Sequence, residues 1–228
     1  MLEPTFVLVH GAWGGQWCWR DLSAELDERG VAWRSMDLPS SRMDAAPGTN
    51  LDDDADAVIE ATLDAGRVVL VGHSYGGAVI TQAAPRIADL SMLIYVAALV
   101  TAPGESATDA SRLVRTRTLL DGAMSLDGEY LRLDASLVPA ALYGHCSDET
   151  QRWATAKIST QTLASFRTPR SAHECETSSR YILCRDDRAV DPSLQEELAK
   201  RCDELVTLDS DHSPFLSHPT QLADLLLS

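Results

Sequence analysis

The sequence has few basic residues and no long apolar run, and both shortages exclude classes of function. Lys and Arg number 19 among 228 residues, against 34 Asp and Glu, which gives a formal net charge of −15. Such a chain repels phosphate backbones and anionic headgroups, so nucleic acids and membrane surfaces are poor partners. The densest acidic run, residues 52–56, is typical of the solvated start of a helix. The longest mostly apolar run, residues 90–100, is shorter than the ~20 residues that a membrane helix needs.

The sequence also lacks closely spaced cysteine pairs and a recognisable targeting signal. The five cysteines are odd in number, and no two of them stand at CxxC spacing. This pattern predicts a reduced protein without disulfides or a zinc site. Residues 1–4 lack the basic segment and apolar core of a secretory peptide. We therefore expect a cytoplasmic protein.

Phosphate-binding motifs are missing as well. A glycine-rich turn, residues 10–15, follows the first apolar run, but neither G-x-G-x-x-G nor G-x-x-x-x-G-K-[ST] occurs in the chain. The sequence therefore predicts no nucleotide cofactor. We expect the protein to work without any cofactor or bound metal.

The arrangement of apolar residues indicates an α/β fold. Hydrophobic residues make up 45% of the chain and charged residues 23%, ordinary values for one globular domain. Short runs rich in Val, Ile and Leu alternate with longer amphipathic stretches, as in parallel strands covered by crossover helices. This predicts an open, doubly wound, mostly parallel sheet of about six strands. The expected strands are 6–10, 31–36, 67–71, 91–97, 180–184 and 204–208, and the expected helices are 17–29, 51–65, 76–86, 193–201 and 220–227.

One interval interrupts this alternation. Between residue 100 and about residue 180 the sequence is irregular and helix-forming, and it is far longer than an ordinary connection. We expect residues 101–170 to form an inserted helical cap, and residues 1–100 and 171–228 to form the core. Within the cap, helices are expected at 109–120, near Glu129 and at 148–164.

The strongest local signal is Gly72-His73-Ser74-Tyr75-Gly76, which lies between an expected buried strand and an expected helix. G-x-S-x-G in that context is typical of a nucleophile elbow, a tight turn that exposes the serine oxygen. The two glycines remove side chains where strand and helix approach each other. Ser74 then lies at the helix N-terminus, where the dipole favours developing negative charge. Ser74 is therefore the expected nucleophile.

A serine hydroxyl needs a general base, and the base needs an orienting carboxylate. In elbow enzymes these groups follow the nucleophile in the order Ser, acid, His. Among the downstream histidines, His212 lies in a loop just after the expected strand 204–208. Open sheets gather their ligands at the carboxyl ends of strands, so His212 is the expected base.

The acid is expected after the strand 180–184, because no carboxylate follows the strand before it. Three candidates stand there, Asp186, Asp187 and Asp191. Asp191 precedes a proline and suits the N-cap of the next helix. Asp187 lies deeper in the loop and is preferred as the acid, with Asp186 as the open alternative.

Two backbone amides are expected to bind the oxyanion of the tetrahedral intermediate. One belongs to Tyr75, directly after the serine, and the other to Ala12 in the glycine-rich loop. Trp13 and Tyr75, at or beside these positions, are expected walls of the substrate pocket. His145 in the cap is a candidate substrate contact, and a structural or solvated histidine fits that position equally well.

Taken together, these segments resemble the α/β-hydrolase family. Within it they are most similar to the small branch of plant methylesterases, salicylate-binding esterases and hydroxynitrile lyases, with bacterial relatives of about this size. His-Gly-Ala followed by Trp-Cys-Trp is typical of that branch. The resemblance implies the same nucleophile, acid, base and oxyanion amides as the reading of the residues. It is carried by residues 6–13, 17–19, 72–77, 187–192, 211–216 and 218–219.

Two departures from the branch favour hydrolysis. Its lyases have a threonine after the histidine of the first loop and a lysine after the catalytic histidine, where this chain has Gly11 and Ser213. We therefore expect hydrolysis of a small carboxylic ester or lactone through an acyl-enzyme. The alternatives are a cofactor-free lyase, perhydrolase or acyltransferase on the same triad, or a ligand receptor with little turnover. A monomer and a homodimer both fit the sequence.

Overall fold

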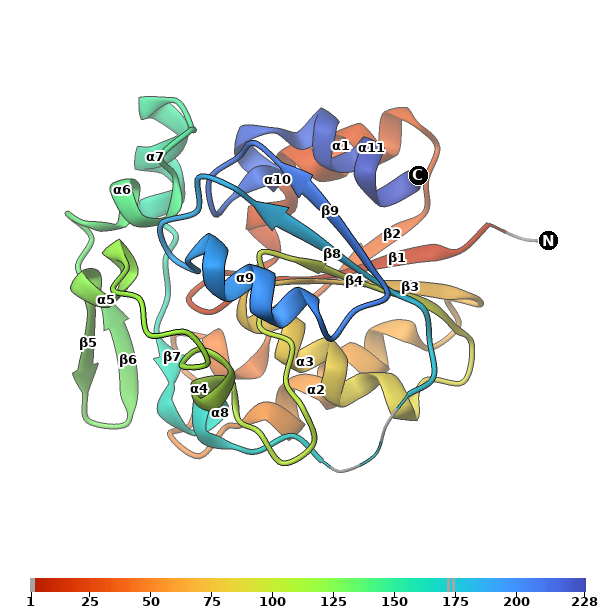
Figure 1. The fold of residues 1–228 in the computed structure, drawn as a ribbon, viewed down its shortest axis with the longest axis horizontal. Coiled ribbons are helices and arrows are strands. Elements are labelled where there is room, and N and C mark those ends of the chain that lie inside the picture. Colours follow the sequence, from red (N-terminus) through yellow and green to blue (C-terminus); the bar gives the residue numbers. More distant parts are fainter. Residues whose placement is uncertain (1–2, 172, 174) are drawn as a thin grey trace.

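A six-stranded parallel sheet forms the centre of the fold (Figure 1), in a computed structural model that describes residues 3–171, 173 and 175–228. The strand order is β2-β1-β3-β4-β8-β9, and every neighbouring pair is parallel. The predicted doubly wound sheet of about six strands is confirmed. Its strands are β1 (Thr5–Val9), β2 (Trp33–Ser35), β3 (Val68–His73), β4 (Leu90–Val96), β8 (Ser179–Cys184) and β9 (Glu204–Leu208).

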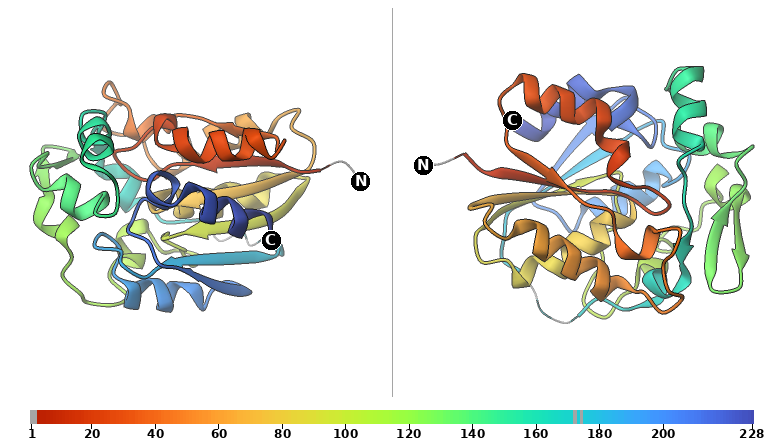
Figure 2. Two further views of the ribbon diagram at one scale, coloured as in Figure 1. Left: turned by 90° about the horizontal axis from the view of Figure 1, so that it is seen from above. Right: turned by 180° about the vertical axis from the view of Figure 1, so that it is seen from behind.

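Helices cover both faces of this sheet, which explains the nearly continuous apolar runs of the central strands (Figure 2). Alternate residues of β1 pack into different clusters. Val7 and Val9 lie with α2, α3 and α9, whereas Phe6 and Leu8 lie with α1, α10 and α11. The helices of the two layers are α2 (Leu51–Thr62), α3 (Tyr75–Ala83) and α9 (Pro192–Ala199) on one face, and α1 (Arg20–Glu28), α10 (Pro214–Ser217) and α11 (Pro219–Leu227) on the other. Short 3-10 turns are η1 (Gln16–Trp19), η2 (Pro39–Ser41) and η3 (Ala84–Arg86).

The interval between β4 and β8 lies beyond the carboxyl ends of the strands, and it is not purely helical (Figure 1). Short helices alternate in it with a small antiparallel sheet of order β5-β6-β7, which the sequence did not predict. Glu129 lies in the turn between β5 and β6, where a short helix was expected. The elements are α4 (Ala107–Ala110), α5 (Leu119–Ala123), β5 (Met124–Asp127), β6 (Tyr130–Leu133), α6 (Val138–Leu142), α7 (Asp148–Thr155), β7 (Gln161–Thr162) and α8 (Leu163–Arg167).

Contacts from distant segments stabilise this small sheet. Trp13, in the loop after β1, donates its indole N–H to the carbonyl of Leu131 in β6 at 2.9 Å. The β5–β6 turn contains Gly128 with φ of +61°, a conformation that glycine adopts readily. Strands this short are stable only in such a tertiary context, so local sequence does not reveal them.

Among the described residues, none of the helices has the length and apolar character needed to span a bilayer.

Candidate functional site

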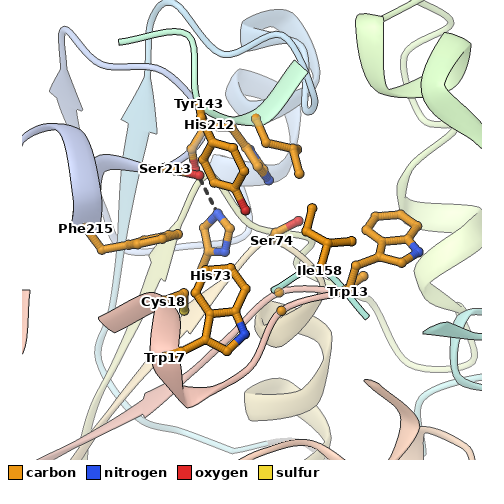
Figure 3. A pocket seen from close by; sticks show the side chains of 14 residues that line it. Trp13, Trp17, Cys18, His73, Ser74, Tyr143, Ile158, His212, Ser213 and Phe215 are labelled. Carbon is orange, nitrogen blue, oxygen red and sulfur yellow. Dashed lines mark hydrogen bonds between the residues drawn. The ribbon is translucent and has the colours of Figure 1, made fainter. Parts of the chain in front are cut away.

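Ser74 stands at the sharp turn between β3 and α3. Its φ of 53° and ψ of −123° lie in a region that a residue with a side chain rarely adopts, which costs about 1–3 kcal/mol. The turn is held by the main chain. The Ser74 amide donates to the carbonyl of Val96, and its own carbonyl accepts from the amides of Gly77 at 3.0 Å and Leu99 at 2.9 Å. As a result the hydroxyl is directed into a pocket (Figure 3).

Glycines permit this turn because the backbone passes too close for side chains. A Cβ on Gly72 would lie 2.7 Å from the carbonyl oxygen of Gly76, and a Cβ on Gly76 would lie 2.6 Å from that of His10. A Cβ on Gly11 would lie 2.9 Å from the Cβ of Ser74. Real Cβ atoms do not approach backbone this closely. The glycine-rich loop after β1 and the turn at Ser74 are therefore packed directly against each other.

Asp187 and His212 form a buried hydrogen-bonded pair. The carboxylate Oδ2 of Asp187 lies 2.7 Å from Nδ1 of His212, and both side chains are almost completely buried. The other oxygen, Oδ1, accepts from the amides of Ala189 at 2.7 Å and Val190 at 3.0 Å. These bonds hold the carboxylate against Nδ1 of the His212 ring and leave Nε2 free to exchange protons.

The alternative carboxylate, Asp186, points elsewhere. Its side chain is exposed, and its Oδ2 lies 3.7 Å from Nε2 of His145. The structure therefore brings Asp187, and not Asp186, to His212. His145 lies with Asp186 and Asp211 in a separate small hollow, and it is not among the described residues that line the pockets at Ser74.

Ser74 and His212 line the same pocket (Figure 3). Among the residues that the structure describes, no hydrogen bond joins the Ser74 hydroxyl to the His212 ring. Such bonds are often long without substrate and tighten in the substrate complex. Ala12 and Tyr75, the expected oxyanion donors, flank the serine from the loop after β1 and from the first turn of α3.

His73 lies directly beside the His212 ring. It donates from Nε2 to the His212 carbonyl at 2.8 Å, and the two ring centroids are 4.5 Å apart. Burial, and secondly the neighbouring His212, hold the pKa of His73 well below its usual value. His73 is therefore uncharged at physiological pH and places no positive charge beside the His212 ring.

Sequence reasoning missed Gln195, a buried residue of α9. Its Nε2 donates to Asp187 Oδ2 at 3.0 Å and to the Val190 carbonyl at 2.7 Å, and its Oε1 accepts from the Cys184 amide at 3.0 Å. Gln195 thus joins the end of β8 to the carboxylate that faces His212. The sequence feature that could have revealed Gln195 was its position in the first turn of a helix that begins directly after the loop containing Asp187.

Asp211, which precedes His212, is also buried, and its carboxylate orders that loop. Oδ1 accepts from the Ser217 hydroxyl at 2.7 Å, and Oδ2 accepts from the amide of His145 at 3.0 Å. Asp211, His145 and His218 offer ligand atoms within 4.8 Å of one another. The hydrogen bonds already account for the burial of this carboxylate, so we assign it a structural part in positioning the loop.

Asp54 corrects the expectation of a wholly solvated acidic run. The helix α2 begins there as predicted, with a capping box between Asn50 and Asp53. Asp54, however, faces inward and is fully buried. Its Oδ1 accepts from the Ser40 amide at 2.9 Å, and its Oδ2 accepts from the Tyr75 hydroxyl at 2.7 Å.

This buried carboxylate belongs to a network that reaches the loop after β1. The Ser40 hydroxyl donates to Asp54 Oδ2 and accepts from Gln161 Nε2 at 2.7 Å. Gln161, in β7, accepts from the Trp13 amide at 3.3 Å. The network therefore ties together α2, α3, the interval between β4 and β8, and the loop that carries Ala12.

We expect Asp54 to make the protein less stable as the pH rises. Burial raises the pKa of its carboxyl to about 6, against the lowering effect of bonds from Ser40 and Tyr75. The unfolded chain, with a pKa near 3.8, ionises first, so stability is full below pH 4 and is lost as pH rises through 6. Ionisation of Asp54 in the folded protein is expected to lower the free energy of unfolding by about 3 kcal/mol. Urea unfolding of the wild type and Asp54→Asn at pH 4 and pH 7 measures it, because the other carboxylates cancel in the difference. Equal pH slopes for the two proteins would contradict this assignment.

Two pockets meet at Ser74. The smaller one, about 410 Å³ and open to solvent, is lined by Ala12, His212 and Phe215 among others. The larger one, about 1670 Å³ and also open to solvent, is lined by residues of α4, α5, α8 and α9. Trp13 lines both pockets, whereas Tyr75, also expected at the pocket wall, is fully buried and is not among the described residues that line either pocket. Ser74 therefore has room for a different part of a molecule on each side.

Known proteins resemble the chain over nearly its whole length. Residues 6–225 match the sequence profile of the alpha/beta hydrolase family. A carbendazim hydrolyzing esterase of a Nocardioides species is 30% identical over 97% of this chain and 98% of its own. Methylesterase 18 of Arabidopsis thaliana is 27% identical over 100% of this chain and 97% of its own.

A solved structure has the same fold. The pyrethroid hydrolase of Sphingobium faniae superposes with a TM-score of 0.86 at 25% sequence identity, covering 99% of this chain and 96% of that one. The likeness extends across both the central sheet and the interval between β4 and β8.

Proposed function

This chain belongs to the alpha/beta hydrolase family, and we propose that it hydrolyses a carboxylic ester through a covalent acyl-enzyme on Ser74. One observation carries the proposal. A buried carboxylate–imidazole pair, Asp187 with His212, lies at the pocket into which a strained elbow directs Ser74. A nucleophile, an orienting acid and a base are the groups that acyl transfer requires, and elbow enzymes carry them in this order along the chain.

The mechanism proceeds in two steps. His212 Nε2 takes the proton of the Ser74 hydroxyl as its oxygen attacks the substrate carbonyl, and the amides of Ala12 and Tyr75 bind the oxyanion. His212 then gives this proton to the departing alcohol. In the second step His212 takes a proton from a water molecule as the water attacks the acyl-enzyme, and it returns this proton to the Ser74 oxygen as the acid is released. Asp187 stays ionised throughout and stabilises the imidazolium.

The two pockets suit the two halves of an ester. The leaving alcohol must receive its proton from His212, which lines the smaller pocket, so the alcohol part belongs there. The acyl part then extends from Ser74 into the larger pocket. A small alcohol joined to a larger acid is therefore the preferred substrate, and this agrees with the methylesterase among the relatives. A lactone, whose alcohol stays tethered to its acyl part, is the second form of the same chemistry.

Lyase chemistry is less well supported by the pocket. Cleavage of a cyanohydrin needs a cation beside the departing cyanide, and the described residues that line the smaller pocket include no Lys or Arg. Ser213 stands where such a lysine would follow His212.

The experiment that tests the function is a stopped-flow burst with p-nitrophenyl acetate, followed by a panel of methyl esters and lactones. An acyl-enzyme predicts a rapid release of about one p-nitrophenol per chain before the steady state, provided that deacylation is the slower step. Labelling of the protein by a fluorophosphonate probe detects the reactive serine independently of that condition. A receptor that merely binds ligands would give neither burst nor label, and that result would overturn the proposal.

A further inference from the structure

Three arginines line the larger pocket at Ser74. Arg112 and Arg115 follow α4, and Arg167 ends α8. The two segments are joined by the Thr108 hydroxyl, which donates to the carbonyl of Phe166 at 2.9 Å. Most other residues of this pocket are apolar, so these cations stand out in a chain with 34 acidic and 19 basic residues.

Among the residues that the structure describes, none of the three guanidinium groups has a salt-bridge partner, although Asp109 lies near Arg112, and the pKa of Asp109 is lowered mainly by bonds from Ser106 and to a smaller extent by Arg112. Within the described part of the chain, none of the three guanidinium groups lies within 4.0 Å of a carboxylate oxygen, and all three residues are exposed. A cation with no ion pair beside an apolar pocket is free to bind an anionic group of a ligand.

Two carboxylates also line this pocket, and both already cap helices. Asp121 accepts from the Thr118 amide at 2.8 Å at the start of α5. Asp191 accepts from the Ser193 amide at 2.9 Å at the start of α9. Among the described residues, three positive charges thus face two carboxylates, each of which has one oxygen bonded to donors at its helix start. The pocket keeps an excess of positive charge within a strongly acidic protein.

We propose that this pocket binds an acyl chain that carries a second, anionic group, so that the substrate is a half-ester of a dicarboxylic acid. The inference rests on the proposed function, because it places the acyl part in the larger pocket. An apolar chain would lie along residues such as Leu131 and Phe166, and the far carboxylate would be bound by the arginines. Guanidinium groups bind carboxylates through paired N–H donors, which makes this end of the pocket selective.

The test compares matched esters. Monomethyl adipate, suberate and sebacate are each paired with the neutral analogue in which a primary amide replaces the free carboxylate, and methanol release is measured. For the best chain length we expect kcat/KM of the acid to exceed that of its amide at least tenfold, because hydrogen bonds between two charged groups are stronger than those to a neutral amide. The preference should shrink at high ionic strength, because the arginines are exposed.

Substitution identifies the groups responsible. The triple variant Arg112→Gln, Arg115→Gln, Arg167→Gln should reduce the acid-to-amide ratio at least tenfold. Arg117→Gln is the matched control, since this exposed arginine lies in the same loop but outside the larger pocket, and it should leave the ratio unchanged. A wild type that treats acid and amide alike, or a triple variant that keeps the preference, would overturn the inference.

A binding measurement separates this inference from the proposed function. Suberate should bind the wild type in calorimetry and should bind the triple variant at least tenfold more weakly, whether or not any ester is hydrolysed. If esters are hydrolysed but suberate binds both proteins equally, the anion site is wrong and the hydrolase stands. If no ester is hydrolysed but suberate binding depends on the arginines, the pocket is an anion site and the proposed catalysis is wrong.

Discussion

Replacing Ser74 by alanine should lower ester hydrolysis by a factor on the order of 10⁴ to 10⁶ and abolish fluorophosphonate labelling. Without the hydroxyl no acyl-enzyme forms, and only binding and the oxyanion amides remain to assist direct attack by water. The hydroxyl has a single covalent role in the mechanism, so this change is expected to have the largest effect of any. Initial rates with p-nitrophenyl acetate, together with probe labelling, measure the loss.

The same position offers a control on folding. Alanine keeps the Cβ and the unfavourable φ of 53°, so Ser74→Ala should unfold at nearly the wild-type temperature. Glycine adopts that conformation easily, and Ser74→Gly should therefore be about 1 kcal/mol more stable than Ser74→Ala. Wild-type rates in a folded Ser74→Ala would remove this residue from the mechanism.

The second large effect is expected from His212→Ala, which should lower kcat by a factor on the order of 10⁴ or more. Loss of the imidazole leaves Ser74 without a base and the leaving alcohol without a proton donor. Asp187→Asn should cause a loss of similar order, because an amide at this position favours the wrong tautomer of the ring. Steady-state kinetics with a methyl ester measure both variants.

Non-additivity distinguishes a cooperating triad from independent contributions. The double variant Ser74→Ala, His212→Ala should be no slower than Ser74→Ala alone, since the base has nothing to activate once the hydroxyl is gone. His218→Ala is a matched control, because this ring lies at the start of α11 and is not among the described residues of the Ser74 pockets. It should keep nearly full activity. Losses that multiply in the double variant would show that the two groups act separately.

The central sheet was predictable because its signals are local. The strand at 204–208 was predicted with its observed bounds, and the strand expected at 180–184 begins one residue earlier, at Ser179. Strands buried on both faces are short runs of Val, Ile and Leu, and glycines and caps limit the intervening helices. The expected helix at 51–65 begins at the predicted residue because Asn50 and Asp53 form its capping box.

The interval between β4 and β8 was harder to predict for the opposite reason. Its helices have four to eight residues, and β7 has two, so no periodic pattern can develop. The expected helix at 109–120 is instead the end of α4, a loop and the start of α5. Pairing of β6 with β7 joins residues about 30 positions apart, and contact with Trp13 adds a partner from the first loop.

Local sequence patterns were enough to predict the α/β architecture and the elbow at Ser74, because both depend on residues that are close together in the chain. Packing in three dimensions places Asp187, rather than Asp186, against His212 and brings Gln195 to the same carboxylate. It also decided that Asp54 is buried. These outcomes depend on which side chains meet across loops and layers, and burial and hydrogen-bond partners come into being only when distant segments pack together.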